Sequence, residues 1–232
     1  MKKLTFAMTM VLAVLLASCS KKQGSCLIPD NAVVVMRLDM TKLLESTGMK
    51  GDDTSLKKEV EKFIKDSGME KEAREKLLEI VDDPTSSGID FTEPMFAYGA
   101  PTELRGGFEG GIVGCIASKG DLVDAIEKLS NEADDISLEE SDGVQYVMLD
   151  RRIALIFNGD WFYIGPVESD VDDTIEQLLD RADGNGNIED NEAFRQMCER
   201  KGLMQWGFFG SGIEGMPQVE EAARNLPDGC EF

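Results

Sequence analysis

One acidic loop, residues 181–192, holds the side chains best suited to chemistry. Aligned with the twelve-residue calcium-binding loop, Asp183 and Asn185 fall at ligand positions three and five, and Glu192 falls at the bidentate twelfth position. Asn187 adds a further oxygen to the set. Helices are predicted on both sides of the loop, as they are around calcium sites of this kind.

Position one departs from the pattern, because it should be a carboxylate and is Arg181. A guanidinium there would place a positive charge beside the ion and remove a ligand at the same time. The alternative interpretation is an interhelical loop rich in Asn and Gly that only mimics the pattern. The sequence therefore favours no metal and no cofactor, and the four oxygens remain candidate calcium ligands only.

A second candidate group consists of Asp82, Asp83 and Asp90, which flank the turn-forming residues 84–88. A glycosidase needs two carboxylates, one of them held protonated in an apolar cleft. The competing interpretation is that these residues cap turns, which Asp does through hydrogen bonds to nearby backbone N–H groups. We favour the turn interpretation.

Four aromatic residues could line a sugar-binding platform: Trp161, Phe162, Tyr163 and Trp206. Consecutive residues of a strand point to opposite faces, so some of these rings must point inward. Packing in the core is therefore the default expectation for them.

The composition excludes several classes of function. The chain has 232 residues and no histidine, which removes Ser-His-Asp and Cys-His catalysis and His-ligated zinc. Its 45 acidic against 24 basic residues give a net charge of −21, which argues against nucleic acid as a partner. No catalytic motif is complete, and we expect the protein not to be an enzyme.

The N-terminus has the layout of a secretory signal. Lys2 and Lys3 precede an apolar run over residues 4–17 that is too short to span a bilayer. Residues 16–19 read Leu-Ala-Ser-Cys and resemble the bacterial lipobox, which implies cleavage before Cys19, a diacylglycerol on its sulfur and an acyl chain such as palmitate on its amine. The sequence thus predicts a lipoprotein signal peptide over residues 1–18 and lipidation at Cys19.

Residues 19–27 are small and polar and are predicted to form a flexible tether to the membrane. Surface-exposed lipoproteins of anaerobic gut bacteria often carry an acidic run after the lipidated cysteine, whereas here Lys21 and Lys22 are basic. We therefore expect a lipid-anchored protein of the outer membrane that faces the periplasm.

Four further cysteines follow Cys19. Cys115 lies in an apolar run that is typical of a buried strand, and such a residue is commonly a buried thiol. A disulfide that involves Cys198 or Cys230 is compatible with an exported protein.

The spacing of apolar residues predicts an α+β fold, a mostly antiparallel sheet with amphipathic helices packed on it. We expect a single domain over residues 28–232. Strands are predicted over residues 32–38, 95–98, 111–117, 144–149, 153–157, 161–164 and 203–209, and the last helix over 216–225. Residues 121–200 hold 22 acidic and 6 basic side chains, which we interpret as a solvated face rather than a docking site.

Residues 28–35, from Ile-Pro-Asp-Asn-Ala into a valine run, resemble the opening of an uncharacterised lipoprotein family of gut anaerobic bacteria, a domain of unknown function. Residues 83–90 followed by Phe96, and residues 191–194 with Trp206, are similar to two further hallmarks of that family. Its members are usually longer, so this chain would correspond to the N-terminal part of their architecture. The resemblance implies an envelope lipoprotein and supplies no catalytic residues.

We therefore expect a membrane-anchored protein of the cell envelope with a noncatalytic binding or scaffolding role, whose partner is an envelope protein or a glycan. The alternatives are a calcium-dependent adhesion or carbohydrate-binding module that uses residues 181–192, and an envelope hydrolase that uses Asp82, Asp83 and Asp90.

Overall fold

The computed structural model describes residues 24–48, 55–101, 108–130, 137–167 and 170–209. The strands are β1 (Val34–Leu38), β2 (Met95–Pro101), β3 (Phe108–Cys115), β4 (Leu138–Ser141), β5 (Val144–Asp150), β6 (Ile153–Phe157), β7 (Trp161–Pro166) and β8 (Met204–Phe208). The α-helices are α2 (Met40–Ser46), α3 (Ser55–Asp66), α4 (Lys71–Asp82), α5 (Lys119–Ser130), α6 (Val171–Ala182) and α7 (Glu192–Glu199). Three short 3-10 helices are η1 (Gly24–Leu27), η2 (Pro84–Ser87) and η3 (Ile188–Asp190).

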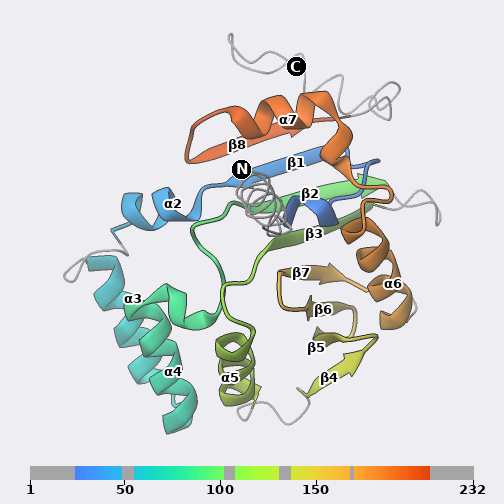
Figure 1. Ribbon diagram of the computed structural model, residues 1–232. Coiled ribbons are helices and arrows are strands. Elements are labelled where there is room, and N and C mark those ends of the chain that lie inside the picture. Colours follow the sequence, from blue (N-terminus) through green and yellow to red (C-terminus); the bar gives the residue numbers. More distant parts are fainter. Residues whose placement is uncertain (1–23, 49–54, 102–107, 131–136, 168–169, 210–232) are drawn as a thin grey trace, which may run out of the picture.

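The eight strands form one sheet in the order β4-β5-β6-β7-β3-β2-β1-β8, and every neighbouring pair is antiparallel (Figure 1). The predicted α+β class is therefore confirmed. The N-terminal and C-terminal strands of the described chain, β1 and β8, lie side by side. The predicted helix over residues 216–225 lies outside the described residues.

One face of the sheet, the covered face, carries the main core. Its central side chains are Val35, Tyr98, Val113, Tyr163 and Ile156, each at most 7% exposed. The elements η1, η3, α6 and α7 pack their apolar side chains into the same cluster. Each fully buried Leu or Ile contributes about 1.5–3 kcal/mol through the area it removes from water.

Helices α6 and α7, on the covered face, each begin at a capping residue. Asp170 caps α6 by accepting a hydrogen bond from the Asp172 N–H, and Asn191 caps α7 by accepting one from the Phe194 N–H. Phe194 is buried and its ring lies 5.9 Å from that of Phe96 and 6.1 Å from that of Phe209. Residues 191–194 thus start α7 and lock it to the sheet.

The opposite face is covered only in part. Helix α5 packs Leu122 against Phe157 and Phe162 at the β4–β7 end of the sheet. Helices α3 and α4 form a hairpin that packs on α5 through α4 (Figure 1). Two buried lysines hold this group together: Lys57 pairs with Asp82 at 2.8 Å, and Lys76 pairs with Asp124 at 3.1 Å.

The spacing of apolar residues in α3 predicts a stripe that faces a core along the whole helix. In the structure only part of this stripe is buried. Ile64 is 6% exposed, but Leu56 is 41% and Phe63 72% exposed. The reason is that α3 packs mainly on α4 alone, so only the side of the helix nearest α4 is covered.

The prediction of a flexible tether over residues 19–27 is wrong for residues 24–27. They form η1, which is buried, and the Gly24 N–H donates to the Cys115 Sγ at 3.3 Å. A Cβ on Gly24 would lie 2.6 Å from the Gly114 Cα, so only glycine allows this close approach to β3. The core therefore begins four residues before the predicted domain boundary at residue 28, whereas residues 1–23 lie outside the described residues.

Candidate functional site

A row of apolar side chains crosses the sheet from one edge strand to the other. From β4 to β8 its members are Leu138, Val147, Leu155, Ile164, Ile112, Ala97, Met36 and Trp206. Each is the register partner of the next, so all eight point to the same face, opposite the covered face.

The exposure of this row changes along the sheet. At the β4–β7 end, α5 and its neighbours cover it, and Val147 is only 1% exposed. At the other end, Ile112 is 41% and Trp206 49% exposed. Among the described residues, one half of this face therefore exposes apolar side chains to solvent.

We name this half the open face. It consists of Val34, Met36 and Leu38 on β1, Ala97 on β2, Ile112 on β3, and Met204, Trp206 and Phe208 on β8. The ring of Trp206 packs edge to face against that of Phe208, with 5.4 Å between centroids. None of these side chains is titratable, so the open face can bind an apolar surface but offers no acid or base.

The candidate calcium loop has a structural use. Asn187 accepts a hydrogen bond from the Glu189 N–H and donates one to the Arg181 carbonyl at 2.9 Å, while Asp183 ends α6. Glu192 lies in the first turn of α7 and accepts from Gln196. Asn185 lies in the turn between them, where its N–H donates to the Asp180 carbonyl at 3.0 Å. Among the described residues, no cluster of three or more acidic or cysteine side chains has the arrangement of a metal site.

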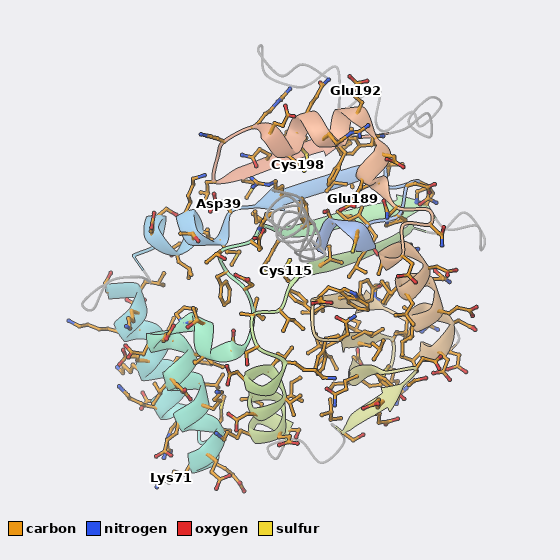
Figure 2. All side chains as sticks on the ribbon, viewed as in Figure 1. Asp39, Lys71, Cys115, Glu189, Glu192 and Cys198 are labelled. Carbon is orange, nitrogen blue, oxygen red and sulfur yellow. The ribbon has the colours of Figure 1, made fainter. Side chains whose placement is uncertain are left out.

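The same loop instead binds the N-terminal segment of the chain. The Asp30 N–H donates to the Gly186 carbonyl at 2.9 Å, and the Ile188 N–H donates to the Ile28 carbonyl at 3.0 Å. The Ser25 hydroxyl donates to Glu189 Oε1 at 2.6 Å. Figure 2 labels Glu189, the acceptor of this last hydrogen bond, beside η1. The loop thus holds residues 25–30, which follow the predicted lipidation site Cys19 by a few residues, against the rest of the fold.

Arg181, the residue that breaks the calcium pattern, points to the sheet instead of the loop. Its Nη2 lies 3.6 Å from Glu109 Oε1, and it also hydrogen-bonds Tyr98. Burial raises the pKa of Tyr98 to about 12, and burial together with the nearby Tyr98 raises the pKa of Tyr163 further. Phenols with raised pKa values are poor bases at neutral pH, so this cluster is a buried polar contact between α6 and the sheet.

The three carboxylates of the hydrolase alternative, Asp82, Asp83 and Asp90, form an ion pair or hydrogen bonds with nearby groups. Asp82 pairs with Lys57, and Asp83 caps η2 by accepting from the Thr85 N–H and hydroxyl. Those hydrogen bonds lower the pKa of Asp83, whereas a catalytic acid needs a raised one. Asp90 accepts from the Thr92 N–H at 3.1 Å. The turn interpretation therefore holds for Asp83 and Asp90, whereas Asp82 forms an ion pair between α4 and α3 instead.

Gly88, within residues 83–90, occupies a backbone position that requires glycine. Its φ of +82° is the left-handed region, and its carbonyl accepts from the Ala117 and Ser118 N–H groups. A Cβ there would meet the Ser118 carbonyl at 2.4 Å. The motif therefore attaches η2 to the start of α5.

The aromatic and cysteine predictions have mixed outcomes. Trp161, Phe162 and Tyr163 are buried as expected, whereas Trp206 lies on the open face. Cys115 is buried in β3. Cys198 is a half-buried free thiol whose pKa is raised by burial, and both Cys230 and the predicted lipidation site Cys19 lie outside the described residues. Within the described ranges, no helix is long and apolar enough to cross a bilayer.

The fold and the open face define an α+β protein, built on a fully antiparallel sheet, that presents an apolar surface. The chain belongs to the family described as "Domain of unknown function (DUF4836)", whose model matches residues 25–171. The first residues matched are those of η1, and the match ends before residues 191–194. No curated protein matches the chain.

Two solved structures resemble the chain, both crystal forms of a protein named TP0453. Form III aligns with a TM-score of 0.48 at 11% identity over 89% of this chain and 68% of that one. Form IV aligns with a TM-score of 0.42 at 11% identity over 79% of this chain and 62% of that one. The chain thus spans about two thirds of the length of these proteins.

The open face could not be predicted from the sequence, although its strands were predicted. Met204, Trp206 and Phe208 alternate with Gln205 and Gly207, and Val34, Met36 and Leu38 alternate in the same way. Period-two alternation identifies the two faces of a strand but not which face is covered, since that depends on where α5 and α7 pack. Which face of these strands is covered depends on tertiary contacts, and the local sequence does not encode them.

Proposed function

We propose that this protein is a noncatalytic binding or scaffolding protein of the cell envelope, anchored by lipid at Cys19 in the outer membrane and facing the periplasm. Its partner is another envelope protein that docks on the open face. The open face carries the proposal, because soluble proteins seldom expose a contiguous apolar sheet surface unless something binds it.

The geometry of the N-terminal segment supports a role in positioning. Because η1 is buried against β3 and held by Glu189, only residues 20–23 separate the predicted lipidation site Cys19 from the folded core. The five residue-to-residue steps from Cys19 to Gly24 span at most about 18 Å. A domain held that close to the membrane has restricted orientations, which suits a protein that presents one surface to a partner.

In-cell photocrosslinking tests the docking site. A photoreactive amino acid at Ile112, the exposed open-face residue on β3, should capture one envelope protein in near-stoichiometric yield. The matched control carries the same amino acid at Glu176, which is exposed on α6. Equal capture from both positions, or none from Ile112, contradicts docking on the open face.

Membrane fractionation tests the anchor separately. Cys19→Ala should release the protein into the periplasmic fraction and remove the crosslink from Ile112 if the anchor brings the partners together. Association of Cys19→Ala with membranes to the same extent as the unchanged protein would refute lipidation at this residue.

A further inference from the structure

The chain leaves the sheet at the end of β8, beside the open face. Phe209 extends β8, because its N–H donates to the Val33 carbonyl at 2.8 Å, and its ring packs against Phe194 on the covered face. Residues 210–232 follow directly and lie outside the described residues. The first six of them, 210–215, include three glycines and span at most about 22 Å. The residues after this stretch can therefore reach back over β8 and β1.

The sequence of this segment predicts a short amphipathic helix over residues 216–225. Pro217 suits the first turn of a helix, and Pro227 prevents its continuation. Apolar side chains follow the spacing i, i+3, i+7 and i+10 and so share one side: Met216, Val219, Ala223 and Leu226. The opposite side is polar and carries Gln218, Glu221 and Asn225. A helix of this length and pattern is stable only if its apolar side packs against another surface.

The open face has the size and the chemistry that such a helix requires. Ten helical residues extend about 15 Å, and the five residues of β8 extend about 17 Å. Met204 and Trp206, which are 51% and 49% exposed, are large apolar side chains, and the small Ala222 and Ala223 leave room for them. Helix α5 already packs Leu122 on the other half of this side of the sheet. A second helix on the open face would extend the same layer.

We propose that residues 216–226 pack on the open face of the same molecule and compete there with the envelope partner. Because the segment belongs to the chain itself, its effective concentration at the open face is in the millimolar range. It therefore covers the apolar side chains until a partner of higher affinity displaces it. The competition rests on the proposed function, whereas the packing of residues 216–226 does not.

Fluorescence of Trp206 measures the packing. The purified chain without residues 1–18 and with Cys19→Ser serves as the parent, because it needs neither lipid nor detergent. The chain has two tryptophans, and Trp161 is only 1% exposed, so quenching by acrylamide reports on Trp206. Acrylamide is neutral, and the net charge of −21 does not repel it. The parent should show weak quenching, and Trp206→Phe identifies the part of the signal that belongs to this residue.

One substitution made at two positions tests which side of the predicted helix packs. Val219→Asp places a charge on the apolar side, and Gln218→Asp places the same charge on the polar side. Val219→Asp should shift the equilibrium toward the uncovered state at least about tenfold and raise the quenching, because full burial of a valine side chain is worth that factor or more. Gln218→Asp should quench like the parent.

Two results overturn the packing. The first is equal quenching of Val219→Asp and Gln218→Asp, whether Trp206 is accessible in both or protected in both. The second is protection of Trp206 that increases with protein concentration, because a second copy of the chain would then cover the open face in place of residues 216–226.

Photocrosslinking from Ile112 tests the competition separately. In a dilution series of solubilised envelope membranes, capture of the partner should persist to about tenfold greater dilution with Val219→Asp than with Gln218→Asp, since the open face is then available in a larger fraction of molecules. Equal capture by the two variants overturns the competition. Absence of capture from Ile112 in every variant refutes the proposed function, whereas a difference in quenching still supports the packing.

Discussion

Leu27→Ala distinguishes most sharply between the tether predicted from the sequence and the folded segment in the structure. Leu27 is fully buried in the main core, although it lies only eight residues after the predicted lipidation site. Removal of a buried leucine side chain down to the Cβ costs about 2–5 kcal/mol, from lost transfer free energy and the cavity left behind. If residues 19–27 were a tether, the cost would be close to zero.

The assays are urea and thermal unfolding of a soluble variant that lacks residues 1–18 and carries Cys19→Ser, both monitored by circular dichroism. A loss of this size should lower the melting temperature by about 4–20 °C in a chain of this length. Leu56→Ala is the matched control, because that leucine is 41% exposed and its truncation should cost less than about 0.5 kcal/mol.

Equal stability of the Leu27→Ala and unchanged proteins would refute the buried position of η1. It would also weaken the argument that the domain lies close to the membrane, since the eight residues 20–27 could then extend between Cys19 and the core. Equal losses from Leu27→Ala and Leu56→Ala would show that truncation of any leucine destabilises the fold, whatever its burial.

Three further predictions follow from the site. Gly88→Ala should lower the free energy of unfolding in urea by clearly more than Gly68→Ala. Both glycines have a positive φ, which costs an alanine about 1–2 kcal/mol, but a Cβ at Gly68 meets open space whereas one at Gly88 also meets the Ser118 carbonyl. Equal costs of the two substitutions would contradict that contact. All three tyrosines should ionise late when phenolate absorbance is followed with pH, because the pKa values of Tyr98 and Tyr146 are raised to about 12 and that of Tyr163 is raised too. Since these pKa values lie above the unfolded value of 10, their contribution to stability is complete below pH 10 and is lost from pH 10 to 12; a folded protein with half its tyrosines ionised at pH 10 would refute the burial of Tyr98 and Tyr163 and the hydrogen bond from Tyr146 to Glu139. Millimolar calcium should leave the melting temperature unchanged, because the polar groups of residues 181–192 already cap helices and bind the N-terminal segment; a rise that Glu192→Gln abolishes would restore the calcium alternative.

Local patterns in the sequence were sufficient to predict most strands and the α+β class. Strands such as 153–157 and 161–164 are apolar runs bounded by turn residues, and the structure has them at these positions. Strand β4 was missed because Leu-Glu-Glu-Ser has no strand pattern of its own. It is extended because Leu138 and Glu140 pair with Val147 and Gln145 of β5.

The roles of the conspicuous residues were harder to predict, because they depend on contacts between distant segments. Arg181 was taken as a defect in a calcium loop, but it binds Glu109 and Tyr98, more than 70 residues away. Ser25 was assigned to a tether, but it bonds Glu189, which is 164 residues away. No local spacing encodes such pairs, so the loop could be recognised as special while its partner could not.

The arrangement of charge and apolar surface along the sheet links the fold to the proposed role. The end with α6 and β4 is strongly acidic, whereas β1 and β8 at the other end carry the apolar side chains of the open face. The N-terminal segment enters between these ends, at β3. The lipid anchor proposed at Cys19 would therefore attach the domain near the middle of the sheet and leave the open face accessible to the envelope partner proposed above.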